Sequence, residues 1–215
     1  MSAARRGVPR RAKMPPMPSV LKIVQAGDPV LRRVARPLDL AELRSPAVQT
    51  LIAQMRDTMR DAPGVGLAAP QIGESIQLVV IEDPPDLQAP LTAEQRAERD
   101  RDAVAFHVLV NPVLVVEDAD PAEFFEGCLS VLDRVMLVPR AKRVRVNALD
   151  EHGQPVTKIG HGWYARILQH EIDHLHGTLC IDRMRSRSFM SVEQHGRFWK
   201  GKSVAEVRAA LGIAD

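Results

Sequence analysis

The sequence predicts one folded domain that combines helices with strands, because helical and strand-like spacings occupy different parts of the chain. Apolar residues recur at spacings of three and four from Pro46 to Met59, and a second helical spacing runs from Trp163 to Leu175. The segment between them is rich in strand-like runs. At 215 residues, the chain has about the length of one domain with a little to spare.

The first 19 residues are expected to form a flexible leader that is basic and rich in proline. Its basic residues are Arg5, Arg6, Arg10, Arg11 and Lys13, with no acidic residue among them. Such an opening resembles an organelle transit peptide or a ribosome-contacting tail. The plainer alternatives are a disordered extension, or translation that starts at Met14 or Met17. Residues 20–215 are then expected to form a single folded domain.

Composition excludes several classes of protein. The formal net charge of +2 becomes negative once the five leader cations are left out, so no basic face for sequence-specific nucleic acid binding is expected. The apolar run IQLVVI is far shorter than a membrane span requires. Two cysteines without a secretory signal do not suggest a disulfide framework. Cytoplasm is therefore the expected compartment, and the leader keeps an organelle as the alternative.

The elements follow in order along the chain. The first helix is expected to stop at Pro63 and Gly64. Four strands are expected next, at Ile76–Glu82, Val108–Glu117, Phe124–Val131 and Val135–Ala148. The charged, proline-containing segment at about 83–105 cannot supply a core strand and is expected to be a surface excursion. Ser203 and Glu206 form a capping-box pattern that predicts a C-terminal helix.

The motif HEIDH carries the strongest chemical signal in the chain. His170 and His174 are four residues apart within the second predicted helix, and Glu171 lies between them. One helical turn separates the two imidazoles, so both can bind one metal ion while the carboxylate reaches a bound water as general base. The alternative is a polar helix face on which two histidines happen to fall one turn apart.

A catalytic metal site normally has a third protein ligand, and the segment EGCLS offers Cys128. Taken alone, a cysteine among apolar residues is more often a small buried side chain, but the histidine pair makes it a candidate ligand. A further segment, PGVGLAAPQIG, contains Gln71, whose amide could face a developing negative charge. A glycine-rich turn between a helix and a strand would look the same.

The motifs GVGLAAPQ, EGCLS and QHEIDHLHG occur in this order, with similar spacing, in the peptide deformylase family. The chain resembles that family over about Val20 to Met184. The resemblance implies an α+β fold in which antiparallel strands surround a central metal-bearing helix. It also implies a metal-dependent hydrolase that removes the N-formyl group from the N-terminal formyl-methionine of nascent polypeptides and releases formate.

The resemblance further implies which residues contact the metal or the substrate. They are Cys128, His170 and His174 as metal ligands, Glu171 as acid and base, Gln71 and the N–H of Leu129 as oxyanion donors, and Gly66 as a hydrogen-bonding partner of the substrate backbone. Val65, Leu129 and Ile167 are expected to line the pocket for the methionine side chain. One divalent ion is expected, Fe²⁺ first, with Zn²⁺, Ni²⁺ and Co²⁺ as alternatives that ligand chemistry does not separate.

Two departures from the family pattern concern the rim of the substrate site. Leu132 stands where many members have proline, and the segment 83–105 is longer than in the shortest members. Two rival functions follow from the same motifs. A metallopeptidase of the HExxH type mostly uses histidine or carboxylate as its third ligand, so Cys128 speaks against it. A non-catalytic peptide-binding protein that keeps the fold would not need Glu171.

Overall fold

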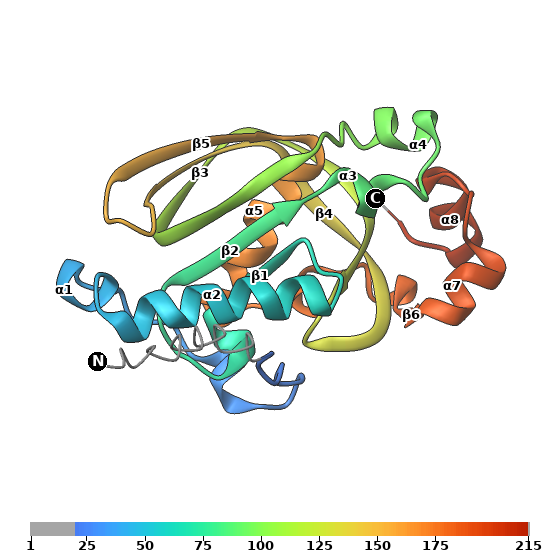
Figure 1. Cartoon of the computed structure of the whole chain (residues 1–215). Helices are drawn as coiled ribbons and strands as arrows, with labels where there is room; N and C mark the ends of the chain where they lie inside the picture. The colour runs from blue at the N-terminus through green and yellow to red at the C-terminus, as the bar shows by residue number, and fades with distance from the viewer. Residues whose placement is uncertain (1–19, 215) are drawn as a thin grey trace, which may run out of the picture.

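The computed structural model describes residues 20–214, and the expected leader at residues 1–19 lies outside the described residues. Five strands form an antiparallel meander in the order β1-β2-β3-β4-β5, and a sixth strand pairs with β4 (Figure 1). The strands are β1 (Gly66–Ala68), β2 (Leu78–Asp83), β3 (Val104–Cys128), β4 (Val131–Leu149), β5 (Pro155–His161) and β6 (Met190–Ser191). Short turns join β3 to β4 and β4 to β5 directly, as antiparallel pairing allows, whereas longer connections that contain helices join β1 to β2 and β2 to β3.

The two strands expected at Val108–Glu117 and Phe124–Val131 are one continuous strand, β3. The pairing of β3 with β4 shifts register between Val110 and Val113 and again between Asp118 and Pro121. Each shift contains a proline, which has no N–H to donate to the ladder. The sequence predicts two separate strands there, whereas the structure has one strand that continues through both register shifts.

Helices cover both faces of the strands β1 to β3. The α-helices are α1 (Leu40–Leu43), α2 (Pro46–Asp61), α3 (Pro85–Gln88), α4 (Ala93–Glu98), α5 (Gly162–Leu175), α6 (Cys180–Arg183), α7 (Val192–Phe198) and α8 (Val204–Leu211). Three short 3₁₀ helices are η1 (Pro29–Arg32), η2 (Ala69–Ile72) and η3 (Ser186–Ser188). The helices expected at 46–59, 163–175 and after Ser203 are confirmed as α2, α5 and α8.

The alternation of side chains along β2 divides the core into two clusters. Leu78 and Val80 belong to the cluster built with α2, whereas Val79 and Ile81 belong to the cluster built with α5. Successive residues of a strand point to opposite faces, so the continuous apolar run of β2 is explained by burial on both sides. The expected α+β fold with antiparallel strands around a central helix is confirmed, since α5 contacts all five strands of the meander (Figure 1).

The excursion segment, defined as residues 84–103 between β2 and β3, supplies no core strand, as expected. It forms α3 and α4 instead. A capping box at Thr92 and Gln95 starts α4, because the two side chains and backbone N–H groups bond reciprocally. Within the described residues, no helix has both the length and the apolar character needed to cross a membrane.

Candidate metal-dependent active site

Three side chains that can bind a metal converge from a strand end and a helix. Cys128 is the last residue of β3, and His170 and His174 lie one turn apart on α5. One potential ligand atom from each residue lies within 4.8 Å of the others, and the Cys128 Sγ is 3.4 Å from the His174 Nε2. Tetrahedral binding of a divalent ion by one sulfur and two nitrogens needs ligands that converge on this scale.

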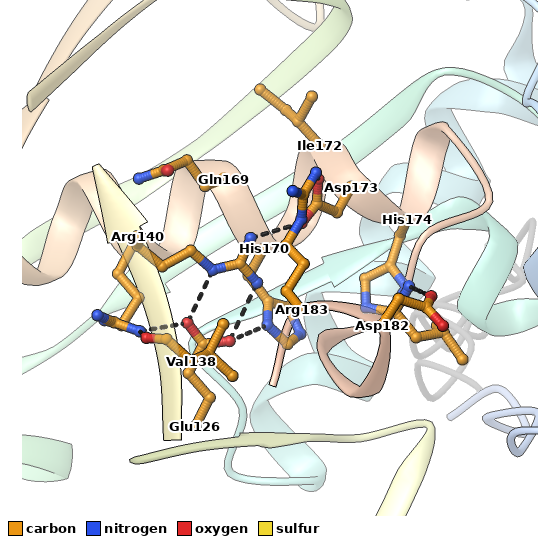
Figure 2. A network of polar contacts seen from close by, with 12 residues as sticks. Glu126, Val138, Arg140, Gln169, His170, Ile172, Asp173, His174, Asp182 and Arg183 are labelled. Carbon is orange, nitrogen blue, oxygen red and sulfur yellow. Dashed lines mark hydrogen bonds and ion pairs between the residues drawn. The ribbon is translucent and has the colours of Figure 1, made fainter. Parts of the chain in front are cut away.

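The His170 ring is held by a carboxylate on the side away from the other ligands. Its Nδ1 lies 3.1 Å from the Glu126 Oε2 (Figure 2). The carboxylate can only accept, so Nδ1–H donates and Nε2 remains for a metal. Burial lowers the pKa of His170, but the hydrogen bond and charge of Glu126 outweigh it and raise the pKa to about 9.

Glu126 is itself embedded among arginines. Its carboxylate accepts from Arg140 at 2.9 and 3.1 Å, and Arg140 also donates to Asp173 (Figure 2). The Glu126 carboxylate accepts from Arg166 as well, at 2.6 Å. Burial disfavours the charged form of Glu126, but His170 and Arg140 hold its pKa well below the usual range. A buried ionised network therefore fixes the orientation of one metal-binding histidine.

Glu171 is buried beside the histidines, and its Oε2 has no hydrogen-bond partner within the described residues. Burial raises the pKa of Glu171 to about 7, against the smaller opposing effect of His170. A carboxyl group with a pKa near neutrality can both take and return a proton at physiological pH. This carboxylate fits the position of a general base.

Gly66 on β1 leaves room for that carboxylate. A Cβ added at Gly66 would lie 2.3 Å from the Glu171 Oε1 and 2.5 Å from its Cδ, which no real side chain tolerates. The position of Glu171 therefore requires glycine here. The same residue lies on β1, which is the end strand of the meander.

The donor set fits a metal ion on chemical grounds. The pKa of the Cys128 thiol is raised, mainly by a hydrogen bond with Cys180 and secondly by burial. The thiolate therefore requires a neighbouring cation to form at neutral pH. Burial also keeps His174 neutral by lowering its pKa, and its Nδ1 lacks a partner within the described residues. A neutral imidazole and a cation-dependent thiolate are what a divalent metal binds.

Gln71 lies on η2 and is almost fully buried beside Cys128. Its Oε1 accepts from the Ala68 N–H at 2.8 Å, which fixes the amide so that Nε2 points to the Ser130 Oγ at 3.4 Å and the Cys128 Sγ at 3.7 Å. Both of these Nε2 contacts are long. The amide donor is therefore oriented toward the metal-binding cluster without a strong partner of its own.

A cavity of about 360 Å³ opens in front of these groups. The predicted site residues on its wall are Val65, Gly66, Gln71, Cys128, Leu129, Ile167, His170 and Glu171. His174 belongs to the ligand cluster but does not line the cavity. The structure thus gathers all nine predicted site residues around one centre.

The roles of three residues at the site are not predicted from the sequence. Trp163 lines the cavity, whereas the sequence predicts only that it lies at the start of a helix. Arg140 contacts Glu126, which holds the His170 ring. It belongs to no recognisable motif, and the sequence predicts only that it lies in a strand. Glu126 is the first residue of the EGCLS segment. A carboxylate so close in sequence to a candidate metal ligand could have indicated that it contacts another ligand.

The sequence predicts no role for Cys180 or His176, and the structure shows where both lie. Cys180 on α6 is buried and contacts Cys128, and both cysteines are free. His176 lies just past α5, where its Nδ1 is 3.0 Å from the Ile172 carbonyl oxygen. It caps the end of the helix and is not part of the ligand cluster.

Known proteins are similar to this chain over most of its length. Residues 20–189 match the family model described as polypeptide deformylase. Peptide deformylase 3 of Streptomyces avermitilis is 48% identical over 194 residues, which cover 90% of this chain and 84% of that protein. The mitochondrial peptide deformylase of Homo sapiens is 43% identical over 178 residues, covering 83% and 73% of the two chains.

Solved structures of peptide deformylases resemble the fold of this chain. A crystal structure of a class I type b peptide deformylase from Acinetobacter baumannii, with Met-Ala-Ser bound, superposes with a TM-score of 0.69 at 33% identity. It covers 78% of this chain and the whole of the other. A peptide deformylase from Legionella pneumophila gives a TM-score of 0.64 at 37% identity and covers 86% of this chain and all of that one.

Proposed function

Because the chain belongs to the peptide deformylase family of metal-dependent hydrolases, which remove N-formyl groups from nascent polypeptides, we propose that the nine gathered residues perform this hydrolysis here. The observation that carries the proposal is the convergence of Cys128, His170 and His174 beside a buried Glu171 that has a pKa of about 7. The products are formate and a free N-terminal methionine.

Cys128, His170 and His174 would hold one divalent ion, with Fe²⁺ as the proposed native metal and Zn²⁺, Ni²⁺ or Co²⁺ as alternatives. When bound, such an ion supplies a Lewis acid and lowers the pKa of a water toward neutrality. Glu126 supports this function by holding the His170 ring with Nε2 directed to the site.

Glu171 carries the proton in both directions. Its carboxylate accepts a proton from the water that attacks the formyl carbon, and later returns it to the amine that leaves. Burial supports this role, since it brings the pKa of Glu171 to about 7 and excludes competing solvent. A base in the open would have an ordinary carboxyl pKa and would accept the proton less readily.

Gln71 and the backbone N–H of Leu129 are the proposed donors to the oxygen that becomes negative during attack. The Gln71 amide is pre-oriented by its bond from the Ala68 N–H, and Leu129 lies in the turn directly after Cys128. Preorganised donors of this kind need no rearrangement during the reaction. Removing one typically costs about 100- to 1000-fold in rate.

The substrate backbone is proposed to lie along β1. This strand has a partner on only one side in the meander, and Gly66 on it lines the cavity. An extended peptide can add to a free strand edge through main-chain hydrogen bonds. Val65, Leu129 and Ile167 on the cavity wall then surround the methionine side chain.

Replacing Gly66 with alanine is expected to lower kcat/KM by about 100-fold, because the new methyl group displaces the Glu171 carboxylate and a misplacement of about 1 Å can have this effect. Formate release measures the loss, and metal content should stay unchanged. Gly196→Ala is the matched control, since nothing lies within 4 Å of a Cβ there. Equal activity of both variants would show that Glu171 adapts without loss.

Cytoplasm is the proposed compartment, although relatives include mitochondrial and chloroplast forms as well as bacterial ones. N-formyl-methionyl nascent peptides are the substrates, and we propose that the enzyme meets them at the ribosome. Residues 20–215 are proposed to act as a single catalytic domain. The two rivals, a metallopeptidase and a binding-only protein, gain no support from a site with a cysteine among its candidate ligands and a well-placed base.

The proposal is tested by formate release from formyl-Met-Ala-Ser, using full-length protein purified without oxygen and loaded with Fe²⁺. Release of formate is the expected result. Folded, metal-loaded protein that releases none would overturn the proposal and favour the binding-only alternative. Cys128→Ala provides a second arm, because retention of the metal by that variant would remove Cys128 from the ligand set.

Air is expected to inactivate the iron-loaded enzyme, because a thiolate beside ferrous iron exposes both metal and sulfur to oxidation. Parallel incubations in air and under nitrogen, followed by formate release and mass measurement of the peptide that contains Cys128, test this. The zinc-loaded enzyme is the control and should keep its activity longer. Equal durability of the iron enzyme in both atmospheres would contradict the proposed iron–thiolate pair.

A further inference from the structure

Trp163 forms part of the cavity wall, and arginines that include two from outside the active site lie close to its ring. Trp163 lies in the first turn of α5, two turns before His170, and lines the cavity. Three guanidinium groups lie within about 6 Å of its ring: Arg101 at 4.9 Å, Arg166 at 5.7 Å and Arg99 at 5.9 Å. Cations at this distance from an indole face are attracted by its π electrons.

Two of the three arginines come from the excursion segment, which is otherwise a surface element. Arg101 is the nearest, and it is fixed by a two-pronged ion pair in which its Nε and Nη2 donate to Asp83 at 2.8 and 2.9 Å. The Asp83 side chain is fully buried at the end of β2, and the Arg101 side chain is 11% exposed. A bidentate pair restricts both side chains to one geometry, so Arg101 is anchored to the sheet.

The backbone of the same segment is also docked on the start of α5. The Trp163 N–H donates to the Asp100 carbonyl oxygen at 3.3 Å, and the His161 Nδ1 lies 2.6 Å from the Asp100 Oδ2. Gly162 has a φ of +51°, and a Cβ there would lie 2.4 Å from Asp100. These contacts fix the backbone at the start of α5 against the excursion segment, directly before the Trp163 side chain.

We propose that Arg101 is a positioning residue that, anchored by Asp83, holds the Trp163 indole as a wall of the substrate cavity and thereby determines which side chain the cavity accepts. The excursion segment is then a specificity element acting through Trp163. The contact of Trp163 with the substrate rests on the proposed function, whereas the contact of Arg101 with Trp163 does not. Arg101 touches neither the ligand cluster nor Glu171 in this arrangement.

The main test uses a neutral pair, Asp83→Asn with Arg101→Gln, in full-length, metal-loaded protein. This double variant leaves no uncompensated buried charge, as Arg101→Gln alone would. We expect KM for formyl-Met-Ala-Ser to rise about tenfold with kcat within twofold, because binding is lost equally from ground and transition states. The preference for formyl-Met-Ala-Ser over formyl-Ala-Ala-Ser should fall by a similar factor.

A spectroscopic arm reports on Trp163 without catalysis. Trp199→Phe leaves Trp163 as the single tryptophan, and adding the neutral pair should shift its emission to the red and increase quenching by acrylamide. Arg96→Gln is the matched control, because Arg96 lies in the same segment and donates to the Leu91 carbonyl oxygen. It should change neither emission nor substrate preference.

Three results would overturn the proposal. One is unchanged emission and preference in the folded neutral-pair variant. Another is a change of equal size in Arg96→Gln. The third is an unchanged methionine preference in Trp163→Leu, a variant that tests the wall even where the neutral pair does not fold. If the parent enzyme released no formate, the proposed function would fail, while the emission arm would still decide whether Arg101 holds Trp163.

Discussion

Replacement of Glu171 with glutamine is expected to lower kcat/KM for formate release by about 1000-fold while the metal stays bound. General acid–base catalysis typically contributes about 100- to 10,000-fold, and Glu171 is the buried carboxylate on the cavity wall with a pKa of about 7. Glutamine keeps the shape of the side chain but cannot take a proton. The loss should fall on kcat more than on KM, because proton transfer occurs in the transition state.

The measurement combines formate release from formyl-Met-Ala-Ser with metal analysis of the same sample. Glu193→Gln is a suitable control, because Glu193 is an exposed carboxylate in the first turn of α7, next to a residue of the cavity wall. It should retain parental activity. A Glu171→Gln enzyme that kept a tenth of the parental rate would assign the proton transfer to another group. Loss of the metal instead would make Glu171 part of the ligand environment.

The parts of the site that sequence could predict are those encoded locally. His170, Glu171 and His174 need only the spacing of a helix, and α5 provides it. Pairing of β3 with β4 brings Cys128 to these residues. The sequence predicts this position of Cys128 only through the resemblance of its motif to a known family. The expected interruption of β3 was wrong because prolines and acids that usually mark a turn here only shift the register.

The parts that could not be predicted depend on contacts distant in sequence. Arg140 reaches Glu126 across the β3–β4 hairpin, and Arg101 reaches Trp163 across 62 residues of chain. Neither arginine belongs to a recognisable motif, and a charged excursion is ordinarily a solvated surface. A tryptophan at helical spacing is likewise more often a core residue than a pocket wall. Tertiary structure alone shows that these residues support the site.

Glu126→Gln is expected to weaken metal binding by about 10- to 100-fold and to lower the free energy of unfolding by about 3 kcal/mol. Glutamine cannot hold the His170 Nδ1–H as a charged acceptor, so the ring loses its fixed orientation. The buried guanidinium of Arg166 would lose Glu126 as its counterion and would keep only neutral acceptors, among them the carbonyl oxygens of Val138 and Ala122. The two effects share one cause, removal of the charge at the centre of the network.

Competition with a chelator measures the metal affinity, and urea denaturation of metal-free protein measures stability separately. Glu123→Gln is the matched control, since Glu123 lies on the same strand and pairs with Arg185 and Arg208 but not with His170. Both variants should destabilise the fold, whereas only Glu126→Gln should weaken the metal site. Equal metal affinity in the two variants would show that the His170 ring is oriented by packing alone, and that the buried charge of Glu126 serves stability rather than the metal.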